Sequence, residues 1–231
     1  GYVTAGKRTT SLQPNGFYLA IIYWVLGGKK SFLSWSLRQR VDRQYFTILQ
    51  FHIMNTIQSF NALANCDAKI LILGSVPGAA SLRANQYYAH PRNTFWNIME
   101  ELFGVPRNAP YPKRIRRLCE CKIALWDVIQ LCVRPGSLDQ AIKKDSVVPN
   151  NFPEFFFRNA DIHSLFFNGA KAEDLYTRLV LPSLPPPFKD IPRNRLPSTS
   201  PAHAAMTYSS KLSAWKTVKR TLDQSKLQRS A

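Results

Sequence analysis

Apolar residues along this chain gather in four short runs, and the segments between the runs show helical spacing. The runs cover residues 69–74, 122–126, 162–167 and about 195–197. In the first run, residues 70–73 are all Ile or Leu, so this strand has no polar face and should be covered on both sides. Strands that alternate with helices predict an α/β domain with a parallel sheet and right-handed crossovers.

Two of the intervening segments carry clear amphipathic patterns. The first has Gly104 as its stop and apolar residues at helical spacing, namely Phe95, Ile98, Met99, Leu102 and Phe103. The last has an apolar face of Leu212, Trp215, Val218 and Leu222 and a basic face of Lys211, Lys216, Lys219 and Arg220. Ser137 and Gln140 match a capping box for a further helix through Ile142.

The charge of the chain predicts a polyanionic partner. Its 231 residues carry 31 Lys and Arg against 14 Asp and Glu, a net charge of +17. The first 53 residues hold seven of the basic side chains and one of the acidic ones, so the remainder still carries 24 against 13, or +11. A hydrolase of small molecules does not need such a charge, whereas nucleic acid or an anionic surface is attracted by it.

The difference in charge composition between the first 53 residues and the remainder indicates where the functional unit begins. We expect residues 1–53 to be a basic appendage, either disordered or upstream sequence foreign to the native protein, residues 54–225 to form the domain, and residues 226–231 to be a tail. The apolar stretch at residues 17–26 is shorter than the roughly 20 residues that span a bilayer. It also lacks the cleavage signature of a secretory signal, although an organelle leader stays open.

Cysteine usage adds no obvious chemistry. The four cysteines, at positions 66, 119, 121 and 132, are few for this length, and the one close pair is C-x-C rather than C-x-x-C. This spacing favours a reducing, intracellular setting over a disulfide framework. We therefore expect no metal site and no cofactor, and a location in the nucleus, the cytoplasm or nucleoid, or an organelle.

Polar and glycine-rich strings follow three of the four strands. They are GSVPGAASL from Gly74, FNGAKA from Phe167 and LPSTSPAHA from Leu196. Because the carboxyl ends of parallel strands share one edge of the sheet, these strings should converge there. The first string is neither a Walker loop nor a GxGxxG turn, so by itself it is either a cradle for a phosphate or base or an ordinary strand-to-helix turn.

These strings form part of a longer resemblance. Together with YYAHPRNTFW from Tyr87, ALWDVI from Ala124 and RPGSLD from Arg134, they resemble the uracil-DNA glycosylase superfamily and, within it, the hypoxanthine (deoxyinosine) DNA glycosylase branch. The resemblance extends from Ile57 to about Val218. It implies a three-layer α/β/α sandwich around a short, mainly four-stranded parallel sheet. It also implies hydrolysis of the N-glycosidic bond of a damaged base that is flipped out of the duplex.

Asn93 is the residue to which the resemblance assigns catalysis. Many superfamily members have an Asp or Asn just after the opening Gly of the first string, where residues 75–77 are Ser-Val-Pro here. In the hypoxanthine branch the role falls to the Asn of the PRNxFW string, and a neutral amide would orient water rather than act as a strong base. From the residues alone, Asn93 suits an N-cap of the following helix better. Asp127 is a minor candidate that either orients water or pairs with Arg134.

The base is expected to be held by the first string and by an Asn amide at the end of the third strand. The donors and acceptor of that amide match O6 and N1–H of hypoxanthine as well as O4 and N3–H of uracil. From the residues alone, Asn168 either holds the base or forms a plain turn with Gly169, and Tyr88 either stacks on the base or packs in the core. The expected base-binding residues are Gly74, Ser75, Pro77, Gly78, Tyr88 and Asn168.

The string from Leu196 matches the superfamily loop that grips phosphate and enters the duplex. Small hydroxyls and backbone N–H groups suit phosphate, while His203 either binds phosphate, stabilises the departing base or lies on the surface. With Ser81 from the first string, the expected members of this loop are Ser198, Thr199, Ser200, Pro201, Ala202 and His203.

The sequence therefore predicts a monofunctional DNA glycosylase that acts as a monomer, without a membrane, on DNA containing a deaminated base, with hypoxanthine as the expected base. A lyase step is not expected, since nothing marks Lys171, the nearest lysine, as an activated amine. Two alternatives stay open, namely a uracil-DNA glycosylase directed to mispairs and a DNA-binding relative that has lost catalysis.

Overall fold

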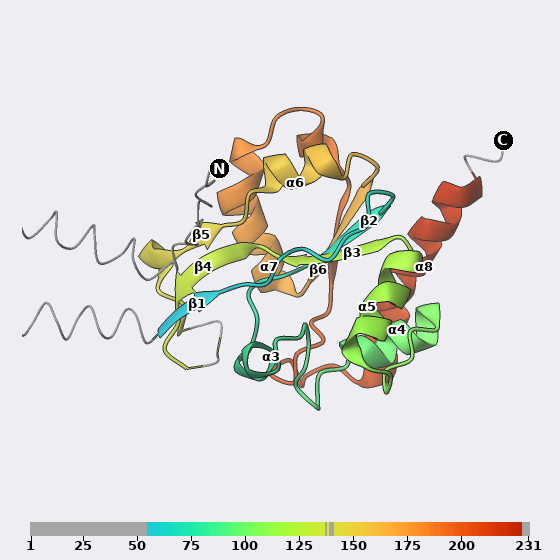
Figure 1. Cartoon of the computed structure of the whole chain (residues 1–231), viewed down its shortest axis with the longest axis horizontal. Helices are drawn as coiled ribbons and strands as arrows, with labels where there is room; N and C mark the ends of the chain where they lie inside the picture. The colour runs from blue at the N-terminus through green and yellow to red at the C-terminus, as the bar shows by residue number, and fades with distance from the viewer. Residues whose placement is uncertain (1–54, 137, 139–140, 228–231) are drawn as a thin grey trace, which may run out of the picture. The chain divides into compact units, whose positions relative to one another are not determined.

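The computed structural model describes residues 55–136, 138 and 141–227 (Figure 1). The expected appendage and the capping residues Ser137 and Gln140 lie outside this part of the chain. The helix expected through Ile142 falls partly on these residues; of the described ones, Ala141 belongs to a 3-10 turn, its N–H donating to the Leu138 carbonyl at 3.0 Å, Ile142 and Lys143 are not helical, and a further 3-10 turn covers Lys144–Ser146. The reason is that this segment bonds to the end of a strand, with the Lys143 N–H donating to the Val133 carbonyl.

Four parallel strands form the central sheet, in the order β3, β2, β6, β7. They are β2 (Ile70–Gly74), β3 (Ile123–Asp127), β6 (Ser164–Asn168) and β7 (Arg193–Leu196). The four predicted strands are thus confirmed, with ends displaced by one or two residues.

In the part of the chain that the structure describes, six α-helices connect or follow these strands. They are α3 (Ala79–Ala84), α4 (Phe95–Phe103), α5 (Tyr111–Glu120), α6 (Phe152–Arg158), α7 (Ala170–Leu175) and α8 (Tyr208–Leu227). A π-helical turn, Tyr176–Val180, and two 3-10 turns, Leu181–Ser183 and Phe188–Asp190, lead from α7 to β7. Within the described residues, no helix combines the length and the apolar character needed to cross a membrane.

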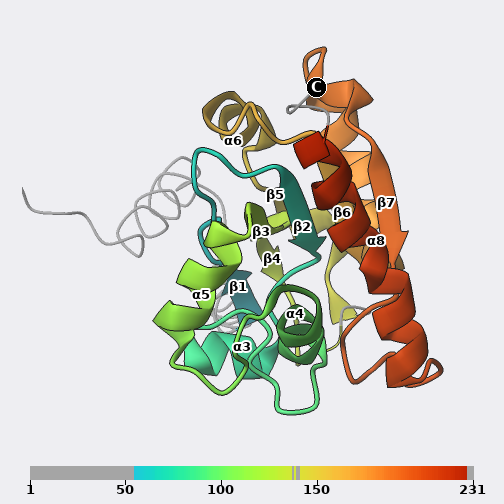
Figure 2. The same ribbon diagram turned by 90° about the vertical axis from the view of Figure 1, so that its right-hand side faces the viewer.

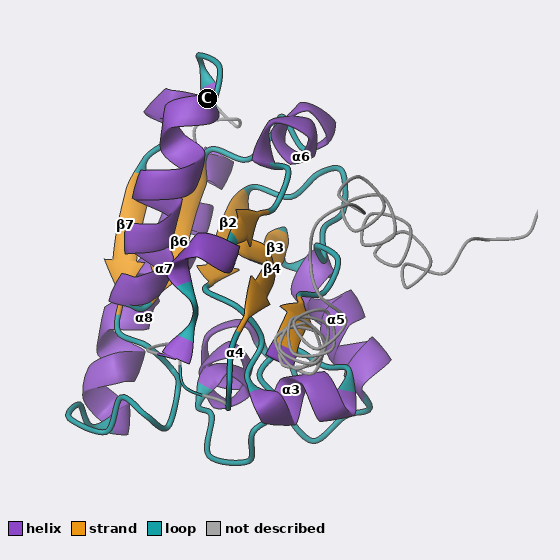
Figure 3. Ribbon diagram, turned by 90° about the vertical axis from the view of Figure 1, so that its left-hand side faces the viewer, coloured by secondary structure: helices purple, strands orange, loops and turns teal. Residues whose placement is uncertain are grey.

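The central sheet is covered on both faces, because successive residues of a strand point to opposite sides. In β2, Ile70 and Ile72 pack with α4, α5 and α8, whereas Leu71 and Leu73 pack with α6 and α7. Figure 2 shows the first group of helices in front of the sheet, and Figure 3 shows the opposite side. This arrangement confirms the three-layer α/β/α sandwich.

A second, antiparallel sheet, which the sequence pattern did not predict, has the strand order β1, β4, β5. β1 (Thr56–Gln58) and β5 (Val148–Pro149) are too short to leave a pattern. A single residue separates the end of β3 from the start of β4 (Ile129–Val133). The two strands therefore look like one strand in the sequence, although they belong to different sheets.

The two amphipathic helices form as predicted, with one exception on α8. α4 is followed by Gly104, whose φ of +63° is the left-handed conformation that ends many helices. On α8, Trp215 and Val218 are fully buried. Lys211, expected on the basic outer face, is only 5% exposed, because its ammonium group reaches back to donate to the His203 carbonyl.

Because helices cover both faces of the central sheet, buried side chains on each face should contribute to stability. Replacing Ile72 or Leu73 by Ala should each lower the free energy of unfolding by about 2–5 kcal/mol, since both side chains are fully buried on opposite faces. Urea denaturation measures both losses. As a control, Lys219→Ala on the exposed side of α8 should change the value by less than about 0.5 kcal/mol. A small loss for either core variant would contradict the three-layer packing.

Candidate active site

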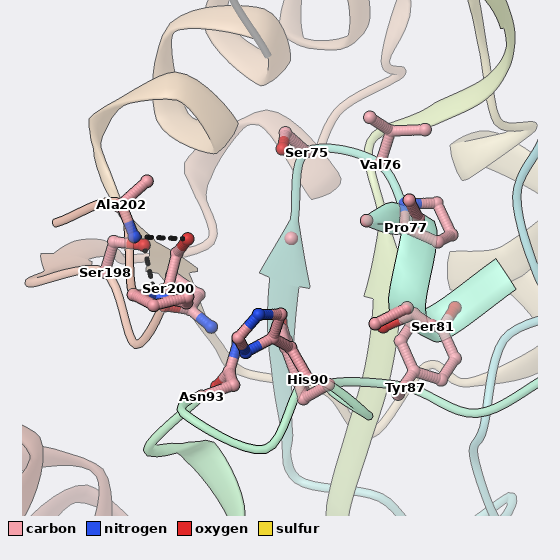
Figure 4. A pocket seen from close by; sticks show the side chains of 18 of the residues that line it. Ser75, Val76, Pro77, Ser81, Tyr87, His90, Asn93, Ser198, Ser200 and Ala202 are labelled. Carbon is pink, nitrogen blue, oxygen red and sulfur yellow. Dashed lines mark hydrogen bonds between the residues drawn. The ribbon is translucent and has the colours of Figure 1, made fainter. Parts of the chain in front are cut away.

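A cavity of about 1080 Å³ opens at the carboxyl ends of β2, β3 and β6. Residues from four separate stretches, 74–83, 87–93, 168–171 and 198–203, line it together with Asp127. In Figure 4 the side chains of Asn93 and His90 lie side by side, between the loop of serines and the turn that follows β2. The strings expected to converge do converge, and every expected site residue lines the cavity except Thr199.

Gly74 is the point at which the backbone, Asp127 and Tyr88 approach most closely. A Cβ atom on Gly74 would lie 2.3 Å from Oδ1 of Asp127 and 3.2 Å from the hydroxyl of Tyr88. The Val128 N–H donates to the Gly74 carbonyl at 2.9 Å, which extends the pairing of β2 and β3. Asp127 is only 2% exposed. Only glycine therefore allows the carboxylate to pack against the end of β2.

Arg134 supports the turn after β2 from inside the protein. Its side chain is 2% exposed, and Nη2 donates to the Pro77 carbonyl at 2.7 Å. A hydrogen bond from a charged donor to a buried carbonyl is stronger than a neutral one. Arg134 thereby fixes the position of Pro77 and the neighbouring backbone, a role that the sequence did not reveal.

Tyr88 is held in an unusual backbone conformation beside this turn. Its φ is +54°, and its ring lies 4.2 Å from that of Phe95, centroid to centroid. Burial raises the pKa of Tyr88 well above its ordinary value, and the nearby charge of Asp127 raises it further. The hydroxyl therefore stays protonated at neutral pH and can donate a hydrogen bond, while one face of the ring is already covered by Phe95.

The Asn93 side chain is fixed at the start of α4. Its Oδ1 accepts the Phe95 N–H at 3.0 Å, but the N-cap residue of α4 is Thr94, so Asn93 caps the helix from one residue before the expected position. In the same segment, Nδ1 of His90 accepts the Arg92 N–H at 3.1 Å, which assigns the proton of the neutral ring to Nε2. The cap uses one lone pair of Oδ1, and the amide retains a second lone pair and its NH₂ group.

Thr199 connects two of the lining segments to its own. Its N–H donates to Oδ1 of Asn168 at 2.8 Å, and its hydroxyl accepts from Nδ2 of the same amide at 2.9 Å. Its carbonyl accepts the Thr94 N–H at 3.1 Å. Thr199 was expected to contact phosphate, but its side chain is fully buried because its polar atoms bond within the protein. The Asn168 amide keeps one N–H and one lone pair for other partners.

Helix α8 anchors both sides of Thr199. Nε1 of Trp215 donates to the Pro197 carbonyl at 3.0 Å, and Nζ of Lys211 donates to the His203 carbonyl at 2.8 Å. Burial lowers the pKa of Lys211. The loop at residues 197–203 is therefore held by side-chain donors at each end as well as at its centre.

The serine hydroxyls of this loop organise its backbone. Oγ of Ser198 accepts the Ser200 N–H and Oγ of Ser200 accepts the Ala202 N–H, both at 3.2 Å (Figure 4). Each hydroxyl proton can still donate to a phosphate. Ser81 differs, because it is 6% exposed and its oxygen accepts the Ala89 N–H.

Several residues that the sequence reasoning did not select also line the cavity. Arg83, His90, Arg92 and Lys171 add positive charge or a donor. All four lie within the strings quoted from the sequence or directly after one of them. A basic residue in such a string could therefore have been predicted to line the site. Leu138, which lies in the string from Arg134, is 58% exposed and also lines the cavity.

The groups assembled here are amides, hydroxyls, one carboxylate and cations. Within the described ranges, no three His, Cys, Asp or Glu side chains are grouped so that they could hold a metal ion. Such a set of groups can orient water, hydrogen-bond a base and bind phosphate.

Comparison with known proteins decides the family. The model of the uracil DNA glycosylase superfamily matches residues 60–221, which include the whole cavity. The chain belongs to the uracil DNA glycosylase superfamily. It is therefore a DNA glycosylase, a hydrolase of N-glycosyl bonds that acts on DNA, and the resemblance drawn from its motifs is confirmed.

Two relatives of this glycosylase carry the name hypoxanthine DNA glycosylase. The protein from Methanosarcina barkeri (strain Fusaro / DSM 804) is 35% identical over 116 residues, which are 50% of this chain and 72% of the relative. The protein from Methanosarcina acetivorans is 33% identical over 135 residues, which are 54% of this chain and 84% of the relative.

A solved structure supports the same fold. It is the solution NMR structure of a candidate uracil DNA glycosylase from Methanosarcina acetivorans, 30% identical to this glycosylase, with a TM-score of 0.61. The match covers 73% of this chain and 99% of that one.

The close approach at Gly74 predicts a strong effect of one methyl group. Gly74→Ala should lower the free energy of unfolding by about 1–3 kcal/mol and reduce base release, because the added Cβ would displace Asp127. Gly78→Ala is the matched control, since no atom lies within 4 Å of its Cβ position. Urea denaturation compares the stability of the two variants, and equal losses would contradict the packing described. Base release by Gly74→Ala is compared with wild type, because Gly78 itself lines the cavity.

The buried clamp at Thr199 predicts a loss that depends on one hydroxyl. Thr199→Val should destabilise the protein by about 0.5–1.5 kcal/mol, because Nδ2 of the half-buried Asn168 loses its acceptor. Thr199→Ser keeps the hydroxyl and should retain most of the stability. Thermal melting of the two variants measures the difference, which should vanish if the hydroxyl is unimportant.

Proposed function

We propose that this glycosylase removes hypoxanthine from DNA and leaves the strand intact. The observation that carries the proposal is the meeting of the Asn93 and Asn168 amides in one cavity, in a chain whose relatives are named hypoxanthine DNA glycosylases. Because its substrate is DNA, we infer an intracellular protein, and we expect it to act as a monomer.

The position of the cavity requires the target nucleotide to leave the duplex. The lining groups lie at the edge of the sheet and extend inward to Asp127, which is 2% exposed. A stacked base cannot reach them, so the enzyme must flip the nucleotide at a cost of a few kcal/mol, which a mispaired base lowers. The cavity volume of about 1080 Å³ is ample for a purine nucleotide.

Asn93 is proposed to position the attacking water. Its hydrogen bond to the Phe95 N–H fixes the amide, so the remaining lone pair of Oδ1 can hold a water molecule without a large loss of entropy. A neutral amide does not remove the proton early. Catalysis then depends on departure of the base toward an oxocarbenium-like state, with the lining groups stabilising the charge that develops. Asp127 is the second candidate for orienting the water.

Recognition of the base is proposed to combine Asn168 with Tyr88. Asn168 has one N–H left for a carbonyl of the base and one lone pair of Oδ1 left for a donor, since one N–H and the other lone pair bond to Thr199. The protonated hydroxyl of Tyr88 is a further donor beside it. O6 of hypoxanthine can accept either bond, and so can O4 of uracil. Uracil in mispairs is therefore the second candidate substrate, favoured by the superfamily match.

A strand-cleaving step is not part of the proposal. Lys171 lines the cavity, so a lysine is present. A lyase needs an amine that attacks C1′ and forms a Schiff base. The proposal assigns no such attack to Lys171. Duplexes treated with the wild-type enzyme should therefore break only after alkali, and breaks without alkali would contradict this part of the proposal.

The role of Asn93 can be separated from its cap. Asn93→Ser keeps an oxygen for the Phe95 N–H and should preserve stability, yet it should lower the single-turnover rate about 10²–10³-fold, because the amide is lost. Labelled duplexes with one hypoxanthine or one uracil, scored for alkali-dependent breaks, measure the rate and the preferred base. Asn97→Ala, on the same helix but absent from the cavity lining, is the control. Undiminished release by Asn93→Ser would exclude the proposed role.

A further inference from the structure

A strongly basic surface lies on α5, outside the cavity lining. Lys113, Arg116 and Arg117 are all exposed. Their spacing of i, i+3 and i+4 places them on one side of the helix. We call these three residues the α5 basic face.

The α5 basic face opposes the stability of its own helix. Lys113 lies in the first turn, which has no acidic residue, so its charge adds to the positive end of the helix dipole. Like charges at these spacings also repel one another. Arg117 pairs with Glu120 at 3.2 Å, one turn further along the same helix. A bound polyanion would offset both effects.

The first turn of α5 is attached directly to the cavity wall. The Tyr111 hydroxyl accepts the Tyr87 N–H at 2.9 Å, and Tyr87 lines the cavity. Nη2 of Arg114 donates to Oε1 of Gln86 at 3.1 Å in the same place. With a rise of about 1.5 Å per residue, the α5 basic face begins about 3 Å along the helix from Tyr111. Successive residues of a helix turn by about 100°, so these side chains point away from the wall that Tyr111 and Arg114 contact, and Lys113, at the N-terminal end of α5, is the member of the face nearest the cavity.

The other cationic helix, α8, is arranged differently. Figure 2 shows α5 and α8 on either side of α4. The first residues of α8 carry hydroxyls rather than charges, and its first exposed cation, Lys216, lies eight residues along, or about 12 Å. Asp223 adds a negative charge one turn after the next two cations, Lys219 and Arg220. The nearer and less compensated charge is on α5.

We propose that the α5 basic face binds the phosphate backbone of the duplex on one side of the flipped nucleotide. The substrate then extends from the cavity along α5 and not along α8. Each strand presents one phosphate about every 3.4 Å along the duplex axis, so three cations within two helical turns can meet two or three of them. The proposal depends on the chain being a DNA glycosylase and not on which base it removes.

The test compares two variants that remove the same charge. K113Q/R116Q/R117Q removes the α5 basic face, and K216Q/K219Q/R220Q removes three exposed cations from α8. Full-length proteins are titrated by fluorescence anisotropy onto a duplex with a stable abasic-site analogue, which is independent of the preferred base. The α5 variant should lower the slope of log affinity against log salt by about two to three, and affinity at 0.1 M salt by about tenfold or more. The α8 variant should change the slope by less than about one.

Two outcomes of this titration would overturn the proposal. An unchanged slope in the α5 variant would show that its cations contact no phosphate. A loss in the α8 variant as large as in the α5 variant would show a general effect of net charge or a path along α8. Thermal melting serves as the folding control, and the α5 variant should melt no lower than wild type, because it loses repulsion within the helix.

The side of the lesion is tested with shortened duplexes. Cutting the duplex close to the abasic analogue on one side should remove the difference between wild type and the α5 variant, and cutting it on the other side should not. A difference that survives both truncations would contradict the proposal. On whichever base wild type removes, the single-turnover rate at saturating α5 variant should stay within about twofold, since the α5 basic face does not touch the reacting atoms. A larger fall would assign these residues to the reaction instead.

Discussion

The carbonyl, N–H and hydroxyl of Thr199 are all bonded inside the protein, and the arrangement of the site depends on these bonds. They join the loop after β7 to Asn168 at the end of β6 and to Thr94 at the start of α4. Asn93 precedes Thr94 directly, so the proposed water-binding amide is positioned relative to the proposed base-binding amide through one buried residue. A buried donor or acceptor without its partner would cost about 1–3 kcal/mol, which makes this geometry rigid.

The site combines neutral groups at its centre with charge around it. The Asn93 and Asn168 amides are neutral, and burial near Asp127 raises the pKa of Tyr87 and Tyr88, so these hydroxyls stay protonated. Arg83 and Arg92 lie in exposed positions at the cavity, where they can meet phosphate. This division suits a reaction in which the base leaves as an anion and the protein contributes orientation and fixed dipoles rather than a strong base.

Local patterns determined most of the fold. Burial of β2 on both faces requires an apolar run, and a helix that packs on one side requires apolar residues at helical spacing, so both can be read from neighbouring residues. β1 and β5 were missed because two or three residues carry no period. The helix expected through Ile142 does not include the described residues Ile142 and Lys143, because the Val133 carbonyl, ten residues before Lys143, accepts the Lys143 N–H.

The sequence by itself determined the parallel sheet, the edge at which its strings converge and the superfamily, because strand patterns and rare strings are local properties. Only the tertiary structure decided which groups within those strings face the cavity. Thr199 turned inward because its partners lie 31 residues away at Asn168 and 105 residues away at Thr94. Lys211 turned from the outer face of α8 toward a loop carbonyl. Hydrogen bonds of this kind join distant segments, so no local pattern of residues could have specified them.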